Sequence, residues 1–163
     1  MQLQLNWQRR PPPSKLQSYA CNLAIGKLYI SMHADCLYQS TWFIDNHTQL
    51  MSSKALQNLI DDIWKNMPVN RLVSLQYQGT SFQRQVWQAI SDIPRGQTRT
   101  YGELASAIKT SPRALANACR QNPFPFIIPC HRVLRKTSIG GYAGHTTGSL
   151  IDLKVALLQH EAG

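Results

Sequence analysis

The chain has 163 residues and a formal net charge of +9, with 17 lysine and arginine residues against 8 aspartate and glutamate residues. This length suits one hydrophobic core or two small ones, and no apolar run reaches the roughly 18 residues that a membrane span needs. The first residues lack the apolar core of a signal peptide, so we expect a cytoplasmic, nucleoid-associated protein with no membrane segment. The four cysteines show no CxxC spacing, so we expect free thiols rather than disulfides.

The positive charge is concentrated in one stretch. Residues 95–136 contain eight lysine and arginine residues and a single acidic residue, Glu103. A solvated basic face is the ordinary explanation for a charge excess, but so one-sided a cluster favours a polyanionic partner, most often a nucleic acid.

The first half of the chain has the pattern of a small antiparallel sheet with one packed helix. Residues 24–32 and 36–44 are short, partly alternating stretches typical of strands, and Gly26–Lys27 is a plausible hairpin turn. Residues 51–67 carry apolar side chains at helical spacing, with Ser52 or Ser53 as the N-cap. The segment 66–81 sustains no helical pattern, so we expect a domain boundary near residue 78 and two domains, 1–78 and 79–163.

Beyond that boundary the signals are helical. Ser81 can cap a helix over 82–93. Thr100 and Glu103 have the spacing of a capping box, which predicts a helix from 101 to 108. Ser111 followed by Pro112 predicts a third helix that ends near residue 120. Two short helices joined by a tight turn in the most basic stretch are typical of a helix-turn-helix.

The third predicted helix has two distinct faces. Positions 113, 116, 117 and 120 carry arginine, alanine, asparagine and arginine, and Leu115, Ala118 and Cys119 occupy the opposite face. The first face is basic and low in bulk, which suits close contact with a nucleic-acid backbone. An ordinary solvated helix is the alternative.

The segment IIPCHRVL, residues 127–134, carries the candidate chemistry. A cysteine in an apolar run is usually inert packing, but Cys130 is followed directly by His131. A free thiol has a pKa of about 8.5, and an imidazole can take its proton, so we expect the Cys130 sulfur to be held as an anion. Adjacent residues of a strand point to opposite faces, so the pair can cooperate only across a turn or through a water. Glu161 and Asp152 are the carboxylates that could orient the imidazole.

Two weaker interpretations concern other cysteines and another chemistry. Cys21, His33 and Cys36 lie close together without a familiar zinc spacing, so we expect no metal. A cysteine hydrolase built on a thiol, a histidine and a glutamate is a further alternative, and it would regenerate its thiol at each turnover.

Six separated motifs resemble those of one family, the methylated-DNA–protein-cysteine methyltransferases, or 6-O-alkylguanine-DNA alkyltransferases. In chain order they are GTSFQRQVW (79–87), IPRGQTRTYGELA (93–105), NP (122–123), IPCHRV (128–133), GYAG (141–144) and LLQHE (157–161). The resemblance implies an α+β protein whose first domain is a ribonuclease-H-like antiparallel sheet with a packed helix. It implies a second, mainly helical domain that binds DNA through a winged helix-turn-helix.

The resemblance also implies a reaction. Cys130 would take the alkyl group from 6-O-methylguanine in DNA, and from 4-O-methylthymine, irreversibly, so that one protein repairs one base. His131 would deprotonate Cys130 through a water, Glu161 would stand behind the imidazole, and Asn122 would brace the turn before the active-site segment. No cofactor or metal is implied. A lesion-binding protein that does not transfer the alkyl group is the alternative.

The DNA contacts implied by the resemblance lie mostly in the basic stretch. The damaged nucleotide would be extruded into a pocket, with Tyr101 crowding the phosphate and Arg113 filling the vacated stack. The partner would be double-stranded DNA, contacted in the minor groove by a monomer. The implied DNA-binding residues are Tyr101, Gly102, Arg113, Arg120, Arg135 and Lys136. The implied pocket residues are Tyr101, Val133, Tyr142 and Ala143.

The chain departs from the family pattern twice. The turn at 109–112 is shorter than usual, which leaves Arg120 as an alternative to Arg113 for the inserted arginine. Residues 145–153 form a longer insertion, expected to be a loop at the pocket rim that changes which alkyl groups fit.

Overall fold

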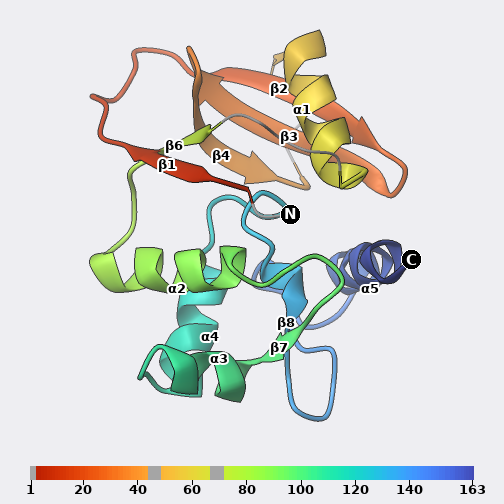
Figure 1. The fold of residues 1–163 in the computed structure, drawn as a ribbon. Helices are drawn as coiled ribbons and strands as arrows, with labels where there is room; N and C mark the ends of the chain where they lie inside the picture. Colours follow the sequence, from red (N-terminus) through yellow and green to blue (C-terminus); the bar gives the residue numbers. More distant parts are fainter. Residues whose placement is uncertain (1–2, 44–48, 67–71) are drawn as a thin grey trace. The chain divides into compact units, whose positions relative to one another are not determined.

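The computed structural model describes residues 3–43, 49–66 and 72–163. These residues form two compact units, Leu3–Gln78 and Gly79–Gly163 (Figure 1). The first consists of a sheet and one helix and the second mainly of helices, so the expected α+β class is confirmed. Among the described residues, no helix combines the length and the apolar character needed to cross a membrane.

The sheet of the first unit is mixed rather than antiparallel. The strands are β1 (Leu5–Gln8), β2 (Gln17–Leu23), β3 (Gly26–His33), β4 (Cys36–Thr41), β5 (Leu50–Met51) and β6 (Val73–Gln76). Their order is β1-β6-β4-β3-β2-β5, and within the part of the chain that the structure describes, antiparallel pairing joins only β2, β3 and β4. β6 pairs in parallel with β1 and β4, and β5 with β2, so the prediction of an antiparallel sheet is corrected. Parallel neighbours need a crossover connection, and helix α1 (Lys54–Trp64) provides it between β4 and β6.

The first hairpin turns two residues earlier than predicted. Leu23 pairs with Gly26, so the turn is Ala24–Ile25, and Lys27 already lies within β3. Aligning Cys21 with Leu28 in this register buries both side chains on the core face. The sequence of the turn alone does not predict this register, because the register is set by which side chains must be buried.

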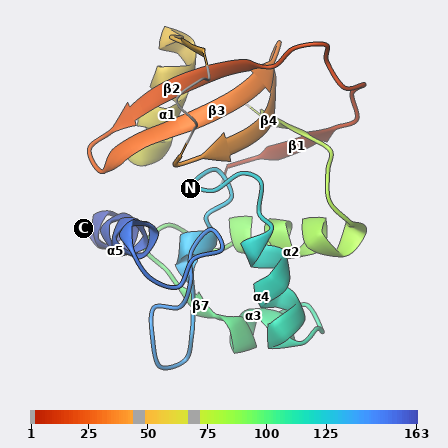
Figure 2. The same cartoon turned by 180° about the vertical axis from the view of Figure 1, so that it is seen from behind.

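Helix α1 (Lys54–Trp64) packs on one face of this sheet (Figures 1 and 2). Ser53 caps it by accepting a hydrogen bond from the Leu56 amide at 3.3 Å, as predicted. The buried side chains of α1 are Leu56, Leu59 and Ile60. The apolar stripe of the sequence is therefore the packed face; its predicted member Met67 lies outside the described residues.

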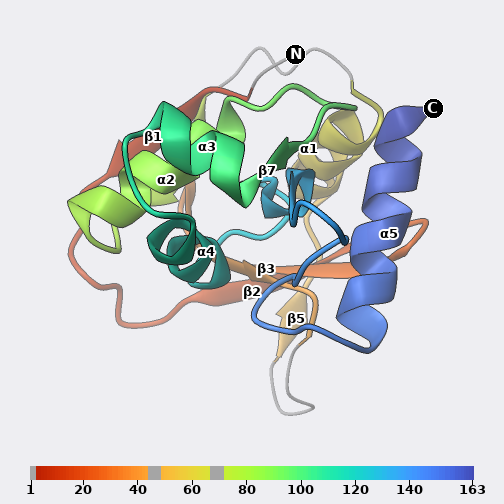
Figure 3. The same ribbon diagram turned by 90° about the horizontal axis from the view of Figure 1, so that it is seen from below.

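The second unit surrounds a short central segment. Within this unit, Figure 3 shows the residues after α4 that contain η1 and β8 running between the α3–α4 pair and α5. β8 pairs in parallel with β7. The elements are α2 (Ser81–Ser91), β7 (Arg99–Thr100), α3 (Tyr101–Ala107), α4 (Pro112–Arg120), the 3₁₀ turn η1 (Cys130–Arg132), β8 (Val133–Leu134) and α5 (Ser149–Ala162).

Local capping fixes the helix starts. Thr100 and Glu103 form the predicted capping box, with the Thr100 amide donating to the Glu103 carboxylate at 2.7 Å. Ser111 accepts from the Ala114 amide at 3.1 Å, which confirms the predicted start of α4. The prediction of Ser81 as the cap of α2 is wrong by one residue. Thr80 is the cap, because its capping box with Gln83 satisfies two amides at once.

The turn between α3 and α4 is a tight C-cap. The amides of Lys109 and Thr110 donate to the carbonyls of Ser106 and Ala105 at 3.2 and 2.9 Å, the pattern of a Schellman motif. Lys109 has φ +55°, in the left-handed region that glycine usually occupies. The shortened 109–112 segment thus ends one helix and starts the next within four residues.

Candidate active site

Cys130 opens the 3₁₀ turn that ends the apolar run 124–129. Its amide donates to the Ile128 carbonyl at 2.8 Å, and its residue surface is only 6% exposed. The turn satisfies the predicted constraint that a Cys–His pair cannot cooperate along a straight strand. His131, 1% exposed, is buried directly behind the cysteine.

Asn122 bonds to the nucleophile segment at three points. Its amide nitrogen donates to the Ile128 carbonyl at 3.0 Å and lies 3.3 Å from the Cys130 sulfur. Its oxygen accepts from the Phe124 amide at 2.9 Å. The bracing contacts that the sequence implied are present, and the direct contact with sulfur was not foreseen. An N–H directed at sulfur stabilises the thiolate more than the thiol.

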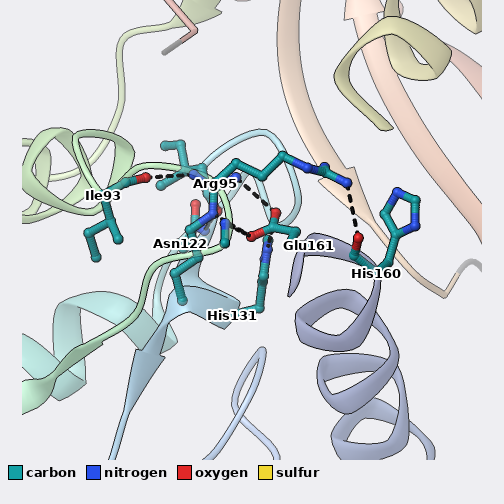
Figure 4. A network of polar contacts seen from close by, with 9 residues as sticks. Ile93, Arg95, Asn122, His131, His160 and Glu161 are labelled. Carbon is teal, nitrogen blue, oxygen red and sulfur yellow. Dashed lines mark hydrogen bonds and ion pairs between the residues drawn. The ribbon is translucent and has the colours of Figure 1, made fainter. Parts of the chain in front are cut away.

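Glu161, near the end of α5, contacts both His131 and Arg132. Figure 4 shows its carboxylate beside the His131 ring. Its Oε1 lies 2.9 Å from His131 Nε2 and 2.8 Å from an Arg132 amino nitrogen, and its Oε2 accepts from Arg132 Nε at 2.8 Å. The other amino nitrogen of Arg132 donates to the Ile93 carbonyl at 2.6 Å. Such a two-pronged guanidinium–carboxylate contact fixes geometry as well as charge. The structure therefore brings Glu161, and not Asp152, to the imidazole.

The other ring nitrogen of the imidazole is unengaged. His131 Nδ1 is buried and has no hydrogen-bond partner among the described residues. With Nε2 donating to a carboxylate, Nδ1 carries the lone pair in the neutral ring. That nitrogen is the proton acceptor that the site offers. The ring of Tyr142 meets the imidazole edge-on, with centroids 6.4 Å apart.

The electrostatics favour a neutral resting pair. Burial raises the pKa of the Cys130 thiol, against the lowering effects of the Asn122 hydrogen bond and the Lys154 charge. Burial likewise lowers the pKa of His131, against the raising effect of Glu161. Both directions oppose the expectation of a standing thiolate. Apolar surroundings penalise the anion, so the thiol keeps its proton at rest beside an imidazole that can accept it.

Glu161 stays ionised at neutral pH. Burial alone would raise its pKa, but hydrogen bonds and charge from His131 and Arg132 outweigh burial and hold the pKa well below its usual range. A permanent carboxylate stabilises an imidazolium when one forms.

A cavity of about 400 Å³ opens in front of the thiol. This volume is within the range of small-molecule pockets. Cys130 lines it, and Cys119 from α4 adds a second thiol. Among the described residues that line it, none is acidic. The predicted site residues that line it are Tyr101, Arg113, Arg120, Arg135, Tyr142 and Ala143.

Three of the predicted DNA-binding and pocket residues lie elsewhere. Val133 is fully buried, and its carbonyl accepts from Lys154 Nζ at 2.7 Å instead of facing the cavity. Gly102 is exposed at the start of α3, and Lys136 is exposed in the segment after β8. Helix α4 has the predicted buried face, formed by Leu115, Ala118 and Cys119.

The far wall of the cavity is a tight turn. The amides and carbonyls of Tyr142 and His145 exchange two hydrogen bonds of 2.9 Å. Ala143 and Gly144 between them have φ +46° and +86°, the left-handed pair that a two-residue hairpin turn requires. His145 and Thr146 of the insertion line the cavity too, as expected for a rim position. Residues 149–153 form the first turns of α5 after the N-cap Gly148, so the prediction of a loop over the whole of 145–153 is corrected.

Sequence reasoning missed two basic side chains, Arg132 and Lys154. Arg132 was visible only as a member of the basic stretch. Lys154 is wholly buried, and its place between Leu150 and Leu157 on the apolar stripe of α5 was the signal available. A lysine at an interior helix position is almost never fully buried without partners.

Cys21 and Cys36 lie in the core of the first unit. Burial raises the pKa of Cys21 to about 11. Among the residues that the structure describes, no three His, Cys, Asp or Glu side chains are grouped so that they could hold a metal ion.

A buried Cys–His–Glu set in front of a cationic cavity defines a protein with a thiol nucleophile. The chain belongs to the 6-O-methylguanine DNA methyltransferase family, because the DNA-binding domain of that family matches residues 81–163, just over half of the chain. The predicted family resemblance is confirmed.

Curated relatives are similar over the second unit. A methylated-DNA–protein-cysteine methyltransferase of Methanocaldococcus jannaschii is 45% identical over 75 residues, which are 46% of this chain and 45% of that protein. The namesake of Methanothermobacter thermautotrophicus is 47% identical over 83 residues, 50% of this chain and 44% of that one. The matched stretch thus spans less than half the length of each of these relatives.

Solved structures are similar over nearly the whole chain. Mycobacterium tuberculosis OGT in complex with DNA has a TM-score of 0.72 and 29% identity, over 89% of this chain and 92% of that one. The O6-methylguanine-DNA methyltransferase of Pyrococcus kodakaraensis, at 21% identity and a TM-score of 0.67, supports the fold alone, over 91% of this chain and 100% of that one.

Proposed function

We propose that the protein repairs DNA by transferring the alkyl group of 6-O-methylguanine, and of 4-O-methylthymine, irreversibly to Cys130. One observation carries this proposal: the Cys130 thiol lines a cation-rimmed cavity, with an amide donor on its sulfur and a buried imidazole whose Nδ1 is free to accept a proton. Family membership adds support, since the matching domain is described as DNA-binding.

The transfer balances without a metal or cofactor. As the sulfur–carbon bond forms, the thiol proton passes to His131 Nδ1, through a water, and Glu161 stabilises the resulting imidazolium. The carbon–oxygen bond breaks, and its electron pair stays on O6 of the guanine. Tyr101 donates its phenol proton or a hydrogen bond there. Burial raises the pKa of that phenol, which keeps it a donor at neutral pH.

The Cys130 thioether has no route back to thiol in this scheme, so each protein acts once. Asn122 and Glu161 position the reacting groups, and the neutral resting pair restrains the sulfur until a lesion occupies the cavity. Cys130 lines the cavity but is buried, so we infer that the damaged nucleotide leaves the stack to reach it.

The DNA-binding part of the proposal rests on the exposed face of α4. Arg113 and Arg120 project from it, with the small side chain of Ala116 between them. Small residues permit close approach to the minor groove, and the α3–turn–α4 pair supports the proposal of a winged helix-turn-helix. Arg113 would fill the vacated stack, while Gly102, Arg135 and Lys136 would contact the backbone.

The remaining parts of the proposal concern the first unit and the cell. The β2–β3–β4 meander with its α1 crossover supports a ribonuclease-H-like description of Leu3–Gln78. We propose a monomer that acts on double-stranded DNA in the cytoplasm, at the nucleoid.

The decisive experiment is a mass measurement. Protein mixed with duplex DNA that contains 6-O-methylguanine should gain one methyl group on the peptide that contains Cys130, at one equivalent per chain. Tight lesion binding with no gain in mass would favour the lesion-binding alternative. More than one equivalent of repaired base per chain, with a free thiol at the end, would favour a hydrolase.

A further inference from the structure

The carboxylate that faces His131 lies in the last turn of its helix. Glu161 is the last residue but one of α5 (Ser149–Ala162). The last four carbonyls of a helix have no partner within the helix, and helix ends fray. A carboxylate in this place therefore needs contacts from outside α5 to stay within hydrogen-bond distance of the imidazole.

The turn that follows α2 reaches this end of α5. Arg95 donates a hydrogen bond to the His160 carbonyl at 3.3 Å, and Figure 4 shows its side chain extended toward the end of the helix. The Gly96 amide is directed at Glu161 Oε2 over 3.5 Å. A guanidinium at a helix C-terminus satisfies a free carbonyl and faces the negative end of the helix dipole. The turn thus contacts both the backbone and the side chain of the last turn of α5.

Position 96 favours glycine for two separate reasons. The Gln97 amide donates to the Pro94 carbonyl at 3.1 Å and Gly96 has φ +74°, the pattern of a type II turn, whose third residue is usually glycine. In addition, a Cβ at position 96 would lie 2.9 Å from the Glu161 carbonyl oxygen, closer than Cβ atoms come to backbone oxygens in proteins. A side chain there would therefore push the turn and the end of α5 apart.

A second glycine of α5 separates these two reasons. Gly148, the N-cap of the helix, has φ +84°, and a Cβ added to it would meet no atom within 4 Å. An alanine at 148 therefore has the backbone strain without the collision. An alanine at 96 has both, so the difference between the two variants measures displacement of the last turn of α5.

We propose that Gly96 and Arg95 are positioning residues of the transfer. The turn they form fixes the last turn of α5 and so holds the Glu161 carboxylate on His131 Nε2. With the carboxylate in place, the ring proton stays on Nε2, and Nδ1 is free to accept the thiol proton of Cys130. If the carboxylate is displaced, the neutral ring can carry its proton on either nitrogen, and the imidazolium loses its stabilising charge. This proposal rests on the proposed function for its role in repair.

Two pairs of substitutions test this role. Gly96→Ala and Gly148→Ala share the strain of a left-handed backbone, and only the first adds the collision. Arg95→Met removes the donor and the charge at the end of α5, while Arg95→Lys keeps a charged donor. Arg99→Met, at an exposed arginine just beyond the turn, is the matched control for loss of one positive charge. Circular dichroism and thermal unfolding report whether each variant folds.

The first readout is the tautomer of His131, and it needs no DNA. The ¹⁵N chemical shifts of the ring nitrogens report which one carries the proton, and the signal of this ring is assigned by its loss in His131→Gln. We expect the proton on Nε2 alone in the wild type and in both controls. Gly96→Ala and Arg95→Met should instead show both tautomers. A folded Gly96→Ala variant with the wild-type ring shifts would overturn the proposal.

The second readout is single-turnover methyl transfer from duplex DNA. We expect Gly96→Ala to bind lesion DNA within about twofold of wild type but to transfer about tenfold or more slowly, since a misplacement of about 1 Å can cost about 100-fold. Arg95→Met should slow transfer about threefold to tenfold, the range for one lost hydrogen bond, and Arg95→Lys should restore it. Equal slowing by Gly148→Ala, or equal losses in binding and transfer, would overturn the positioning role.

The proposal can be decided even if one variant or one activity fails. If Gly96→Ala does not fold, the Arg95→Met and Arg99→Met pair decides, and equal ring shifts in the two would overturn the proposal. If the wild-type protein transfers no methyl group, the proposed function fails, while the His131 ring shifts still test whether the turn holds the carboxylate.

Discussion

Replacing Glu161 by glutamine should strongly destabilise the second unit. The Glu161 side chain is 6% exposed, and its two oxygens lie 2.8–2.9 Å from three nitrogens of His131 and Arg132. A glutamine has one acceptor oxygen and presents an N–H₂ group to donors. Removing one partner of a buried ion pair costs about 3–5 kcal/mol, so we expect a loss of that size in the free energy of unfolding at pH 7.

The measurement should report on residues 79–163 alone. Hydrogen exchange of peptides from α2, α4 and α5 across a urea series gives the free energy of unfolding of this unit separately from the sheet. Glu103→Gln is the matched control, because Glu103 is an exposed capping residue and glutamine also completes a capping box. If Glu161→Gln costs less than about 1 kcal/mol, the three contacts do not form a buried ion pair of the expected strength.

The same variant makes a prediction about pH. Hydrogen bonds hold the folded pKa of Glu161 below its unfolded value. The stability it contributes is therefore fully present above the ordinary carboxyl pKa of about 4.3 and is lost as the pH falls toward the folded pKa. The advantage of the wild type from this carboxylate should be constant between pH 6 and 8 and should decline below about pH 4. An advantage that rises on acidification would refute the assignment.

Four further outcomes follow from the site. Cys130→Ser should keep duplex binding but gain no methyl group, as judged by peptide mass. Asn122→Ala should slow transfer about tenfold or more, because it removes the contact with the Cys130 sulfur and the hydrogen bonds that brace the turn. A hydrogen bond to a charged group contributes about 1.5–3 kcal/mol, and stopped-flow single-turnover rates would test this. Arg113→Ala should slow repair of duplex DNA far more than reaction with the free base. An equal loss on both substrates, or a duplex-specific loss in Arg120→Ala instead, would contradict the assignment of Arg113 as the inserted arginine. Lys109→Gly should raise the free energy of unfolding by roughly 0.5–1 kcal/mol because glycine accepts the left-handed conformation, and a urea midpoint that falls would contradict it.

The second unit was the more predictable half because its signals are local. Thr100, Glu103 and Ser111 make their capping contacts within three residues along the chain. The buried face of α4 follows from spacing alone. The shift of the α2 cap to Thr80 shows the limit, since two neighbouring residues with similar side chains compete for one position.

The sheet was less predictable because its pairing is long-range. β6 lies in a stretch that shows no sustained pattern, and β1 was not recognised as a strand. Their residues pair Leu5 with Val73, across the whole first unit. The sequence of neither strand indicates which strand it pairs with. Parallel pairing becomes visible only when α1 is known to be a crossover.

The sequence predicted which residues form the site but not their protonation states. The motif placed Cys130, His131 and Glu161 in one chemistry, and the distances show the histidine and glutamate in contact. The degree of burial, which decides the protonation state, depends on α5 packing against the turn. Lys154 was not predicted as a site residue for the same reason, because a lysine is expected to be solvated until the buried face of its helix is known.

A protonated resting thiol suits the proposed reaction, in which each protein would act once. A standing thiolate reacts with any small electrophile, and each such event would consume a protein permanently. Burial of Cys130 and His131 keeps both neutral, so the anion appears only when its proton can pass to the imidazole with Glu161 behind it. Asn122 and Lys154 lower the free energy of that anion without making it the ground state. In the proposed reaction the site would thus restrict attack to an alkyl group already held in the cavity, and this selectivity matters because the nucleophile would not be regenerated.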